Sequence, residues 1–234
     1  MEILCAIDTG VLCGVEQWFT DPAQWTGPSG IPVRLAEHVY YSVLALLVAT
    51  AIAVPLGLLT GHTGVGGFLT TSLANFARAL PTIGVLFLIV LLAGIGLVPV
   101  LCALVALAVP PILVNTHEGV RGVESRLKDA ALGMGMRGRE VLFKLELPVA
   151  APLVLIGMRT AAVQVVATAT IAAYVGVGGL GRYIVDGQAR QDLSMMLGGS
   201  ILVVSLAVVT TLLFAGLRRV LVAPGLRAEA ASAR

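Results

Sequence analysis

The sequence predicts an all-α fold, a polytopic bundle in which about five helices cross a membrane. Of the 234 residues, 58% are hydrophobic and 12% are charged, whereas water-soluble domains average about 45–50% apolar and about 25% charged residues. The mean hydropathy is +0.97, and long stretches contain no Asp, Glu, Lys or Arg. A soluble enzyme is therefore not expected. The balance of 15 basic and 13 acidic residues argues against a nucleic-acid partner.

Five segments of the chain are long and apolar enough to span a bilayer. The Gly61–Gly67 segment ends the first span, because clustered glycines favour a loop. The stretch from Gly94 to Pro99 separates the second span from the third. At about 1.5 Å per residue, the shortest span reaches about 28 Å, close to the thickness of a bilayer core. The predicted spans are residues 39–60, 68–93, 97–115, 149–175 and 195–217.

Basic residues set the orientation of the predicted bundle, since Lys and Arg in short loops favour the cytoplasmic side. With the N-terminus outside, the inner side holds six basic residues between the third and fourth spans and four after the fifth, against three outside. The N-terminus is therefore predicted outside and the C-terminus inside. The domains are an N-terminal interfacial or periplasmic tail (1–37), a membrane domain (38–217) with a cytoplasmic loop (117–147), and a basic cytoplasmic tail (218–234).

The N-terminal tail has apolar residues at three- and four-residue steps, which is typical of a helix lying on a membrane surface. Trp18 suits the headgroup level in this interpretation. A plain tail packed against the bundle is an equal alternative. Cys5 and Cys13 can pair in an oxidising compartment, but no other feature indicates a disulfide framework. Because the cysteines and histidines lack metal-ligand spacing, neither a metal site nor a redox role is expected.

The cytoplasmic loop has the pattern of a short amphipathic helix-turn-helix. Ser125 is placed to cap the first helix, Gly133 and Gly135 to end it, and Gly138 to bend the chain. A second short apolar face is predicted to end at Pro148, where the fourth span begins. Because such a pair has no role in spanning the bilayer, it predicts a partner protein with a groove for it. The apolar positions are Leu127, Ala130, Ala131 and Met134, then Val141, Leu142 and Leu145.

The same loop resembles the EAA coupling motif of binding-protein-dependent ABC importer permeases. Asp129-Ala130-Ala131 is followed after three residues by Gly135, and after nine more by Leu145-Glu146-Leu147-Pro148. The family motif has Glu where this chain has Asp129, and Ile where it has Leu145; both departures are mild. A connecting loop without a partner is the alternative. By this resemblance, the residues that couple to an ATPase are Asp129, Ala130, Ala131, Met134, Gly135, Leu145, Leu147 and Pro148.

The resemblance implies a permease of the type I ABC importer fold, with residues 38–217 as its transmembrane type-1 domain. It implies no catalytic residue and no cofactor on this chain, which lacks the G-x-x-x-x-G-K-[ST] phosphate loop, so ATP with Mg²⁺ binds a separate ATPase. Closure of the ATPases would tilt the fourth span and drive alternating access. The implied partners are ABC ATPase subunits, a second identical or different permease chain, an extracytoplasmic substrate-binding protein and the bilayer of a bacterial inner membrane.

Two further segments, residues 75–82 and 168–181, resemble the osmoprotectant branch of these permeases, and this resemblance extends from Trp25 to Leu217. That branch imports glycine betaine, choline, carnitine or proline betaine. Methionine-importer permeases share the coupling motif and the Gly178-Gly179-Leu180-Gly181 turn, so a permease for methionine or another small solute is the alternative. A channel or membrane enzyme is a more remote one, because the spans lack convergent His, Asp, Glu or Cys side chains.

Polar groups within the predicted spans are candidates for a translocation path, since an unpaired charge in lipid is costly. Arg78 faces either that path or the carbonyls that Pro81 frees. The Gly176–Gly181 turn is either an outer gate or a flexible hairpin. Aromatic residues make up 5% of the chain, too few for a quaternary-ammonium cage, so selection is expected mainly in the binding protein. The candidates for path or gate are Arg78, Pro81, Gln164, Thr168, Thr170, Gly178 and Gly179.

Overall fold

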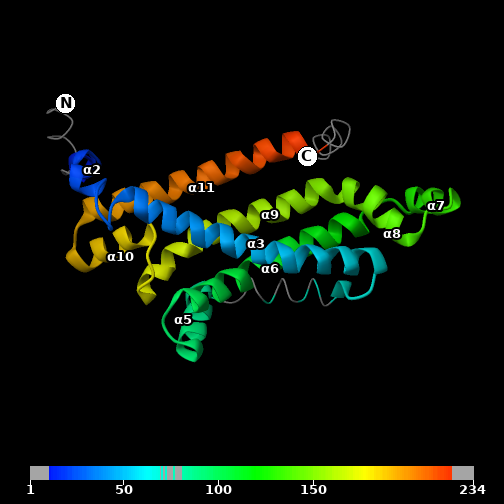
Figure 1. Ribbon diagram of the computed structural model, residues 1–234, viewed down its shortest axis with the longest axis horizontal. Coiled ribbons are helices and arrows are strands. Elements are labelled where there is room, and N and C mark those ends of the chain that lie inside the picture. The colour runs from blue at the N-terminus through cyan, green and yellow to red at the C-terminus, as the bar shows by residue number, and fades with distance from the viewer. Residues whose placement is uncertain (1–10, 69, 71, 73–75, 77–80, 223–234) are drawn as a thin grey trace. The chain divides into compact units, whose positions relative to one another are not determined.

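The computed structural model describes residues 11–68, 70, 72, 76 and 81–222, and these residues form helices joined by turns (Figure 1). Four helical stretches of this part of the chain are long and apolar enough to cross a membrane, which confirms the predicted all-α membrane class. The elements are α2 (Val11–Thr20), η1 (Pro22–Gln24), α3 (Ile31–Thr63), α5 (Thr82–Ala93), α6 (Leu97–Arg121), α7 (Ser125–Gly133), α8 (Gly138–Val141), η2 (Leu142–Glu146), α9 (Leu147–Ala169), η3 (Thr170–Val175), α10 (Gly181–Arg190) and α11 (Leu193–Leu221).

The long helices extend beyond the predicted spans. α3 begins at Ile31, so the segment before residue 39 that was expected to be a tail is already helical. α6 begins at Leu97, as predicted, but continues to Arg121. Residues 69, 71, 73–75 and 77–80 of the predicted second span lie outside the described residues. The described end of that span is α5, whose 12 residues follow Pro81 and reach about 18 Å.

The second short apolar face, predicted to end at Pro148, continues into the fourth span without a break in the helix. α8, η2, α9 and η3 continue as one helical stretch from Gly138 to Val175. Pro148 has no N–H to donate to a carbonyl one turn back. The turn before it is π-helical, and the Leu147 N–H donates to the Leu142 oxygen, five residues back. The wider turn accommodates the proline, so the second half of the loop 117–147 is continuous with the fourth span.

The chain divides into two compact units, and the long helices contribute to both. Unit 1 comprises Met1–Ala45, Thr82–Leu104 and Val165–Val209. Unit 2 comprises Leu46–Pro81, Val105–Gln164 and Thr210–Arg234. Each unit has buried side chains of its own, so the packing of each can be followed separately.

In unit 1, α2 packs through Trp18 against Tyr183 of α10. The two rings meet edge to face with their centroids 5.1 Å apart, and Ile31 and Leu180 complete the buried cluster. Burial raises the pKa of Tyr183 above its ordinary value, and its hydroxyl donates a hydrogen bond to the Ser29 oxygen at 2.7 Å. The burial of Trp18 supports the alternative in which the N-terminal tail packs against the protein.

In unit 2, small residues bring α3 and α9 close to α6. A Cβ on Gly57 of α3 would lie 2.6 Å from the Thr116 Cβ of α6, and one on Gly157 of α9 would lie 2.7 Å from the Asn115 Cβ. Real Cβ atoms do not approach this closely, so both contacts require glycine. Glycine at helix contacts is typical of membrane bundles, in which packing rather than exclusion of water holds helices together.

Gly157→Ala is expected to lower the melting temperature of the detergent-solubilised protein. The added Cβ would lie 2.8 Å from the backbone oxygen of Pro111, which cannot move as a flexible side chain can, and overpacking of this kind costs about 1–3 kcal/mol. The matched control is Gly216→Ala in α11, where a Cβ meets nothing within 4 Å. Equal melting temperatures for the two variants would contradict the close packing of α9 on α6.

Candidate functional site

The first helix of the loop 117–147, α7, begins without a side-chain cap. The N-cap position is Glu124, one residue before the predicted Ser125, and its side chain makes no capping hydrogen bond. The N–H groups of Leu127 and Lys128 donate to the Glu124 oxygen at 3.0 and 3.3 Å. The helical turn therefore already includes the Glu124 carbonyl, and Ser125 becomes the first helical residue, which corrects the prediction that it caps the helix.

α7 ends as the glycine pattern predicts. Gly135 has a φ of +86°, a left-handed conformation that is strained for residues with a Cβ. The Gly135 N–H donates to the Leu132 oxygen at 2.9 Å, and the Met136 N–H donates to the Ala131 oxygen at 3.1 Å. This pair of bonds satisfies two carbonyls at the helix end. It also reverses the chain between α7 and α8, which brings the two halves of the coupling motif together.

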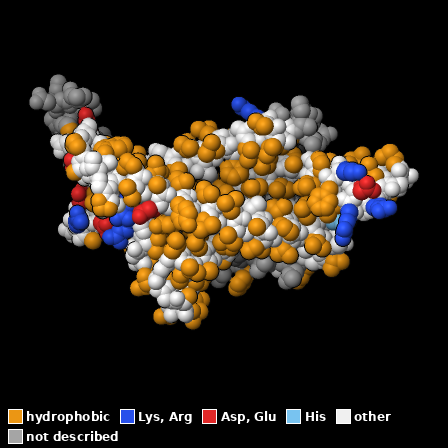
Figure 2. Space-filling view, viewed as in Figure 1, with side chains coloured by type: hydrophobic (Ala, Val, Ile, Leu, Met, Phe, Trp, Pro, Cys, Tyr) orange, Lys and Arg blue, Asp and Glu red, His pale blue; other side chains and the backbone are white. Residues whose placement is uncertain are grey.

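The loop exposes a set of large apolar side chains. Met134 is 74% exposed, and Leu127 is also exposed, whereas Ala131 is buried, so the predicted apolar face of α7 is divided between interior and surface. Sequence reasoning missed Leu132 and Phe143, which are exposed as well. Around α7, Figure 2 shows orange hydrophobic side chains among blue basic and red acidic ones. We call Leu127, Leu132, Met134 and Phe143 the loop apolar surface.

The remaining motif residues differ in exposure. Asp129 and Ala130 are exposed on α7. In the second half of the motif, Leu145 and Leu147 are half-buried and Pro148 is exposed. A partner that docks on the loop can therefore reach Asp129 and Ala130 directly, whereas Ala131 is buried.

Two partly exposed side chains, His62 and Lys128, contact a buried carboxylate in the loop, and sequence reasoning missed this cluster. Glu146 is fully buried (0% exposed). Its Oε2 lies 2.5 Å from Nδ1 of His62, at the end of α3, and its Oε1 lies 2.7 Å from Nζ of Lys128 on α7. Lys128 and Glu146 form an ion pair whose geometry is not that of a hydrogen bond. The Lys128 ammonium donates its hydrogen bond to the Val120 oxygen of α6 instead, at 3.2 Å. We call Glu146, Lys128 and His62 the Glu146 cluster.

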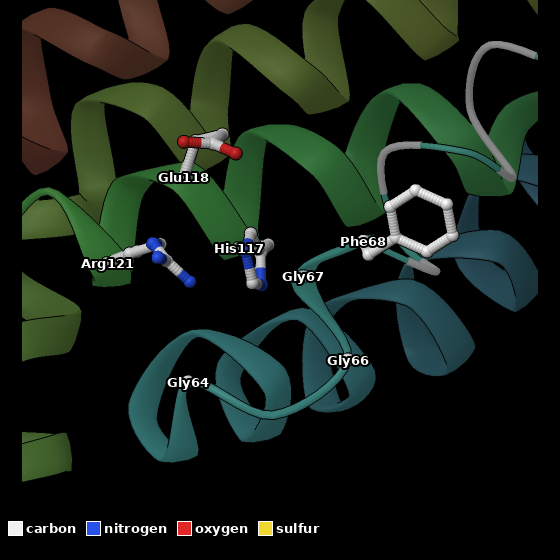
Figure 3. A pocket seen from close by; sticks show the side chains of 7 residues that line it. All are labelled: Gly64, Gly66, Gly67, Phe68, His117, Glu118 and Arg121. Atoms are coloured by element: carbon white, nitrogen blue, oxygen red, sulfur yellow. The ribbon is translucent and has the colours of Figure 1, made fainter.

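A pocket of about 520 Å³ lies beside the segment that ends α3. Gly64 and Gly66 in this segment have φ values of +71° and +89°. The glycines therefore end α3, but only after Thr63, because residues 61–63 of the predicted loop are still helical. His117 and Arg121 of α6 point toward the segment, whereas Glu118 of the same helix points away from it (Figure 3). The pocket is lined by none of the ATPase-coupling residues predicted from the motif.

In unit 1, a carboxylate near the start of α3 holds the Gly176–Gly181 turn. Glu37 Oε2 accepts a hydrogen bond from the Gly179 N–H at 2.8 Å and pairs with Arg34 Nη1 at 3.0 Å. A Cβ on Gly178 would overlap the Glu37 carboxylate. Gly178 and Gly179, the two glycines predicted as path or gate residues, therefore contact the Glu37 carboxylate. This contact anchors the turn.

The neighbouring His38 anchors the same turn from the interior. Its ring is buried, and its Nε2 lies 2.9 Å from the Val166 oxygen. Because a carbonyl oxygen only accepts hydrogen bonds, Nε2 must carry the proton in this contact. Its Nδ1 accepts from the Leu180 N–H at 3.3 Å. The two contacts require the neutral tautomer with the proton on Nε2. The turn is thus fixed at two adjacent backbone N–H groups, those of residues 179 and 180.

The other residues predicted for the path have less distinctive surroundings. Thr170 Oγ1 donates to the Ala167 oxygen at 2.7 Å, within its own helical stretch. Gln164 and Thr168 are half-buried, and Pro81 is exposed. Arg78 lies outside the described residues.

Two observations concern cysteines and metals. Cys13 is disulfide-bonded, although the sequence indicated no disulfide framework, whereas Cys102 is a free, exposed thiol. Cys5 lies outside the described residues. Across residues 11–68, 70, 72, 76 and 81–222, no group of three or more His, Cys, Asp or Glu side chains is arranged to hold a metal ion.

Helices long enough to cross a membrane, with the short exposed helix α7 between two of them, are compatible with the class of transport permeases. Residues 53–226 match the family described as the binding-protein-dependent transport system inner membrane component. The chain belongs to this family and is an inner-membrane component of such a system. Membership places it among permease subunits, which take part in transport without catalysing a reaction.

Several characterised relatives resemble this chain over most of their length. The glycine betaine/carnitine/choline transport system permease protein OpuCB of Bacillus subtilis is 33% identical, over 83% of this chain and 89% of its own. The choline transport system permease protein OpuBB of the same organism is 35% identical, over 82% and 88%. The carnitine transport permease protein OpuCB of Listeria monocytogenes is 36% identical, over 76% and 81%.

The fold is also found in a solved transporter. A chain of the MetNI methionine ABC transporter in an inward-facing conformation superposes with a TM-score of 0.74 and covers 87% of this chain and 100% of its own, at 20% identity. At this identity the likeness concerns the fold. It supports the expected permease architecture without bearing on the solute.

Glu37→Ala is expected to accelerate hydrogen exchange of the backbone amides at residues 179 and 180. Loss of a hydrogen bond to a charged group costs about 1.5–3 kcal/mol, so local opening should become at least about tenfold more frequent. Exchange measured by mass spectrometry on peptides covering this turn provides the readout, and Glu16→Ala on the exposed surface of α2 is the control. Unchanged exchange in the Glu37 variant would show that the turn does not depend on this carboxylate.

Proposed function

We propose that this chain is the permease subunit of an ATP-driven ABC importer for osmoprotectants of the glycine betaine and choline type. The observation that carries the solute class is the set of relatives that are 33–36% identical over at least three quarters of both chains, whose names specify glycine betaine, carnitine or choline. The methionine transporter shares the fold at 20% identity. A common fold hosts many solutes, so it gives methionine no comparable support.

The proposed arrangement in the membrane has five spans, with the N-terminus outside and the C-terminus in the cytoplasm. Four spanning stretches among the described residues and the excess of basic residues in the loop 117–147 and the tail support it. The fifth span would be residues 68–93. The domains are then the outer tail 1–37, the transmembrane type-1 domain 38–217 and the cytoplasmic tail 218–234.

Coupling to the ATPase is proposed to occur through the cytoplasmic loop. The loop apolar surface offers contact area to a partner, with Met134 as an adaptable side chain at its tip. Asp129 and Ala130 lie exposed on the same helix, Gly135 forms the reversal, and Leu145, Leu147 and Pro148 belong to the stretch that continues into α9. An ATPase that moves α7 would therefore move a continuous helix. ATP with Mg²⁺ would be bound by the ATPase.

The substrate is proposed to pass along a path that this chain forms with a second permease chain. Gln164, Thr168 and Thr170 would contribute polar groups from the fourth span, and Arg78 with Pro81 from the second. The anchored turn at Gly178 and Gly179 suits a rigid outer rim on which an extracytoplasmic binding protein can dock, since its position is held by Glu37 and His38. Selection of the solute would rest mainly with that binding protein.

The test of the proposed function is uptake of radiolabelled choline and glycine betaine at high osmolarity. Host cells without uptake systems of their own express this chain with its ATPase and binding protein, and unlabelled methionine serves as competitor. The proposal predicts uptake that requires this chain and is unaffected by methionine. Absence of uptake of both amines, with the complex assembled and hydrolysing ATP, would overturn the solute class.

A further inference from the structure

The Glu146 cluster joins four separate segments of unit 2 at one carboxylate. Glu146 belongs to η2, just before the fourth span, and contacts Lys128 of α7 and His62 at the end of α3. Through its second contact, with the Val120 oxygen, the Lys128 ammonium also reaches the end of α6. The end of α3 and the helix α7 therefore meet at Glu146, and the end of α6 is joined to them through Lys128.

The cluster lies inside the coupling motif rather than beside it. Lys128 immediately precedes Asp129, and Glu146 lies between Leu145 and Leu147. The ion pair therefore links the two halves of the motif directly, at 2.7 Å. If the ion pair were absent, α7 would be joined to α8 along the chain by residues 134–137, where the chain reverses at Gly135 with its positive φ.

The burial of this carboxylate requires an explanation other than stability. Removing a carboxylate from water costs several kcal/mol, and ion pairs in protein interiors often do no better than apolar side chains of the same size. Their best-attested role is to specify one arrangement of the groups around them. The chain itself provides the contrast: Glu140 and Lys144 form a pair at 2.8 Å on the exposed side of the same helical stretch, where such a pair contributes little.

We propose that Glu146 is a positioning residue for energy coupling: through Lys128 it fixes the coupling helix α7 to the start of the fourth span, so that motion imposed on α7 reaches α9. The inference rests on the proposed function of the loop as the ATPase contact. His62 holds the other carboxylate oxygen and ties the same point to α3. The Glu146 cluster thus makes α7, η2 and the end of α3 move as one body.

The test compares Glu146→Gln with Glu140→Gln in the complete complex with its ATPase and binding protein, reconstituted in proteoliposomes. The measured quantity is choline or glycine betaine uptake per ATP hydrolysed. We expect Glu146→Gln to reduce this ratio at least about fivefold, the lower end of typical coupling between sites, with the same amount of ATPase retained on the complex. Glu140→Gln should keep the wild-type ratio. A wild-type ratio in Glu146→Gln would overturn the proposal.

A second variant separates positioning from stability. The double variant Lys128→Gln with Glu146→Gln removes both charges of the ion pair, whereas Glu146→Gln alone leaves the Lys128 charge without its partner. The complex with the double variant should therefore assemble at least as well as the complex with the single variant. The proposal predicts that its uptake per ATP stays as low as that of the single variant, because both changes break one contact. Recovery of the ratio together with assembly would mean that the cluster acts on stability only.

Hydrogen exchange of α7 gives a readout that depends on neither solute nor ATPase. In the purified complex, amides of residues 125–133 should exchange at least about fivefold faster in Glu146→Gln than in Glu140→Gln. If the wild type imports neither amine, the proposed function fails, and the exchange of α7 still decides whether Glu146 positions the helix. Equal exchange in the two variants would contradict the positioning role.

Discussion

Close packing of helix backbones is the constraint on which unit 2 depends. At membrane depth there is no water to drive helices together, and every backbone polar group must be satisfied within a helix. Association then relies on contact, and contact requires small residues where helices meet. Gly57 and Gly157 meet this requirement on the two helices that pack against α6. These contacts fix where α3 and α9 lie against α6, the helix that precedes the loop 117–147.

The same constraint explains how a loop can act on a span. A helix that broke at Pro148 would leave unpaired backbone groups at the membrane boundary and would separate the loop from the fourth span mechanically. The π-helical turn at residues 142–146 avoids the break. The Glu146 cluster adds a second connection, from α7 to that turn. Under the proposed function, these two connections link α7, the helix proposed to contact the ATPase, to the helical stretch that continues into α9.

The sequence predicted what depends on composition and on local chemistry. The membrane class follows from hydropathy, and the end of α7 follows from Gly135, whose backbone conformation is strained for other residues. Predictions from single residues were wrong where the adjacent residues decide whether a helix begins or continues. The apolar face predicted to end at Pro148 continues into α9, because the preceding turn widens for the proline. Ser125 was predicted as the cap, but the cap position is Glu124, and Ser125 is the first helical residue.

The charged contacts were beyond sequence reasoning for a physical reason. Glu146 and His62 are separated by 84 residues, and Glu37 and Gly179 by 142, so no pattern within one segment signals either pair. The sequence did contain one signal for such a contact: a charged residue between apolar ones, such as Glu146 between Leu145 and Leu147. It indicates a buried or partnered charge without naming the partner.

The account depends most directly on α7 being the surface that meets the ATPase. A photo-crosslinking amino acid placed at Met134, in the assembled complex, tests this contact, with Leu193 at the start of α11 as an exposed control on the proposed outer side. The account predicts a crosslink from position 134 to the ATPase subunit and none from position 193. The absence of an ATPase crosslink at 134, or its appearance at 193, would contradict the assignment of the loop.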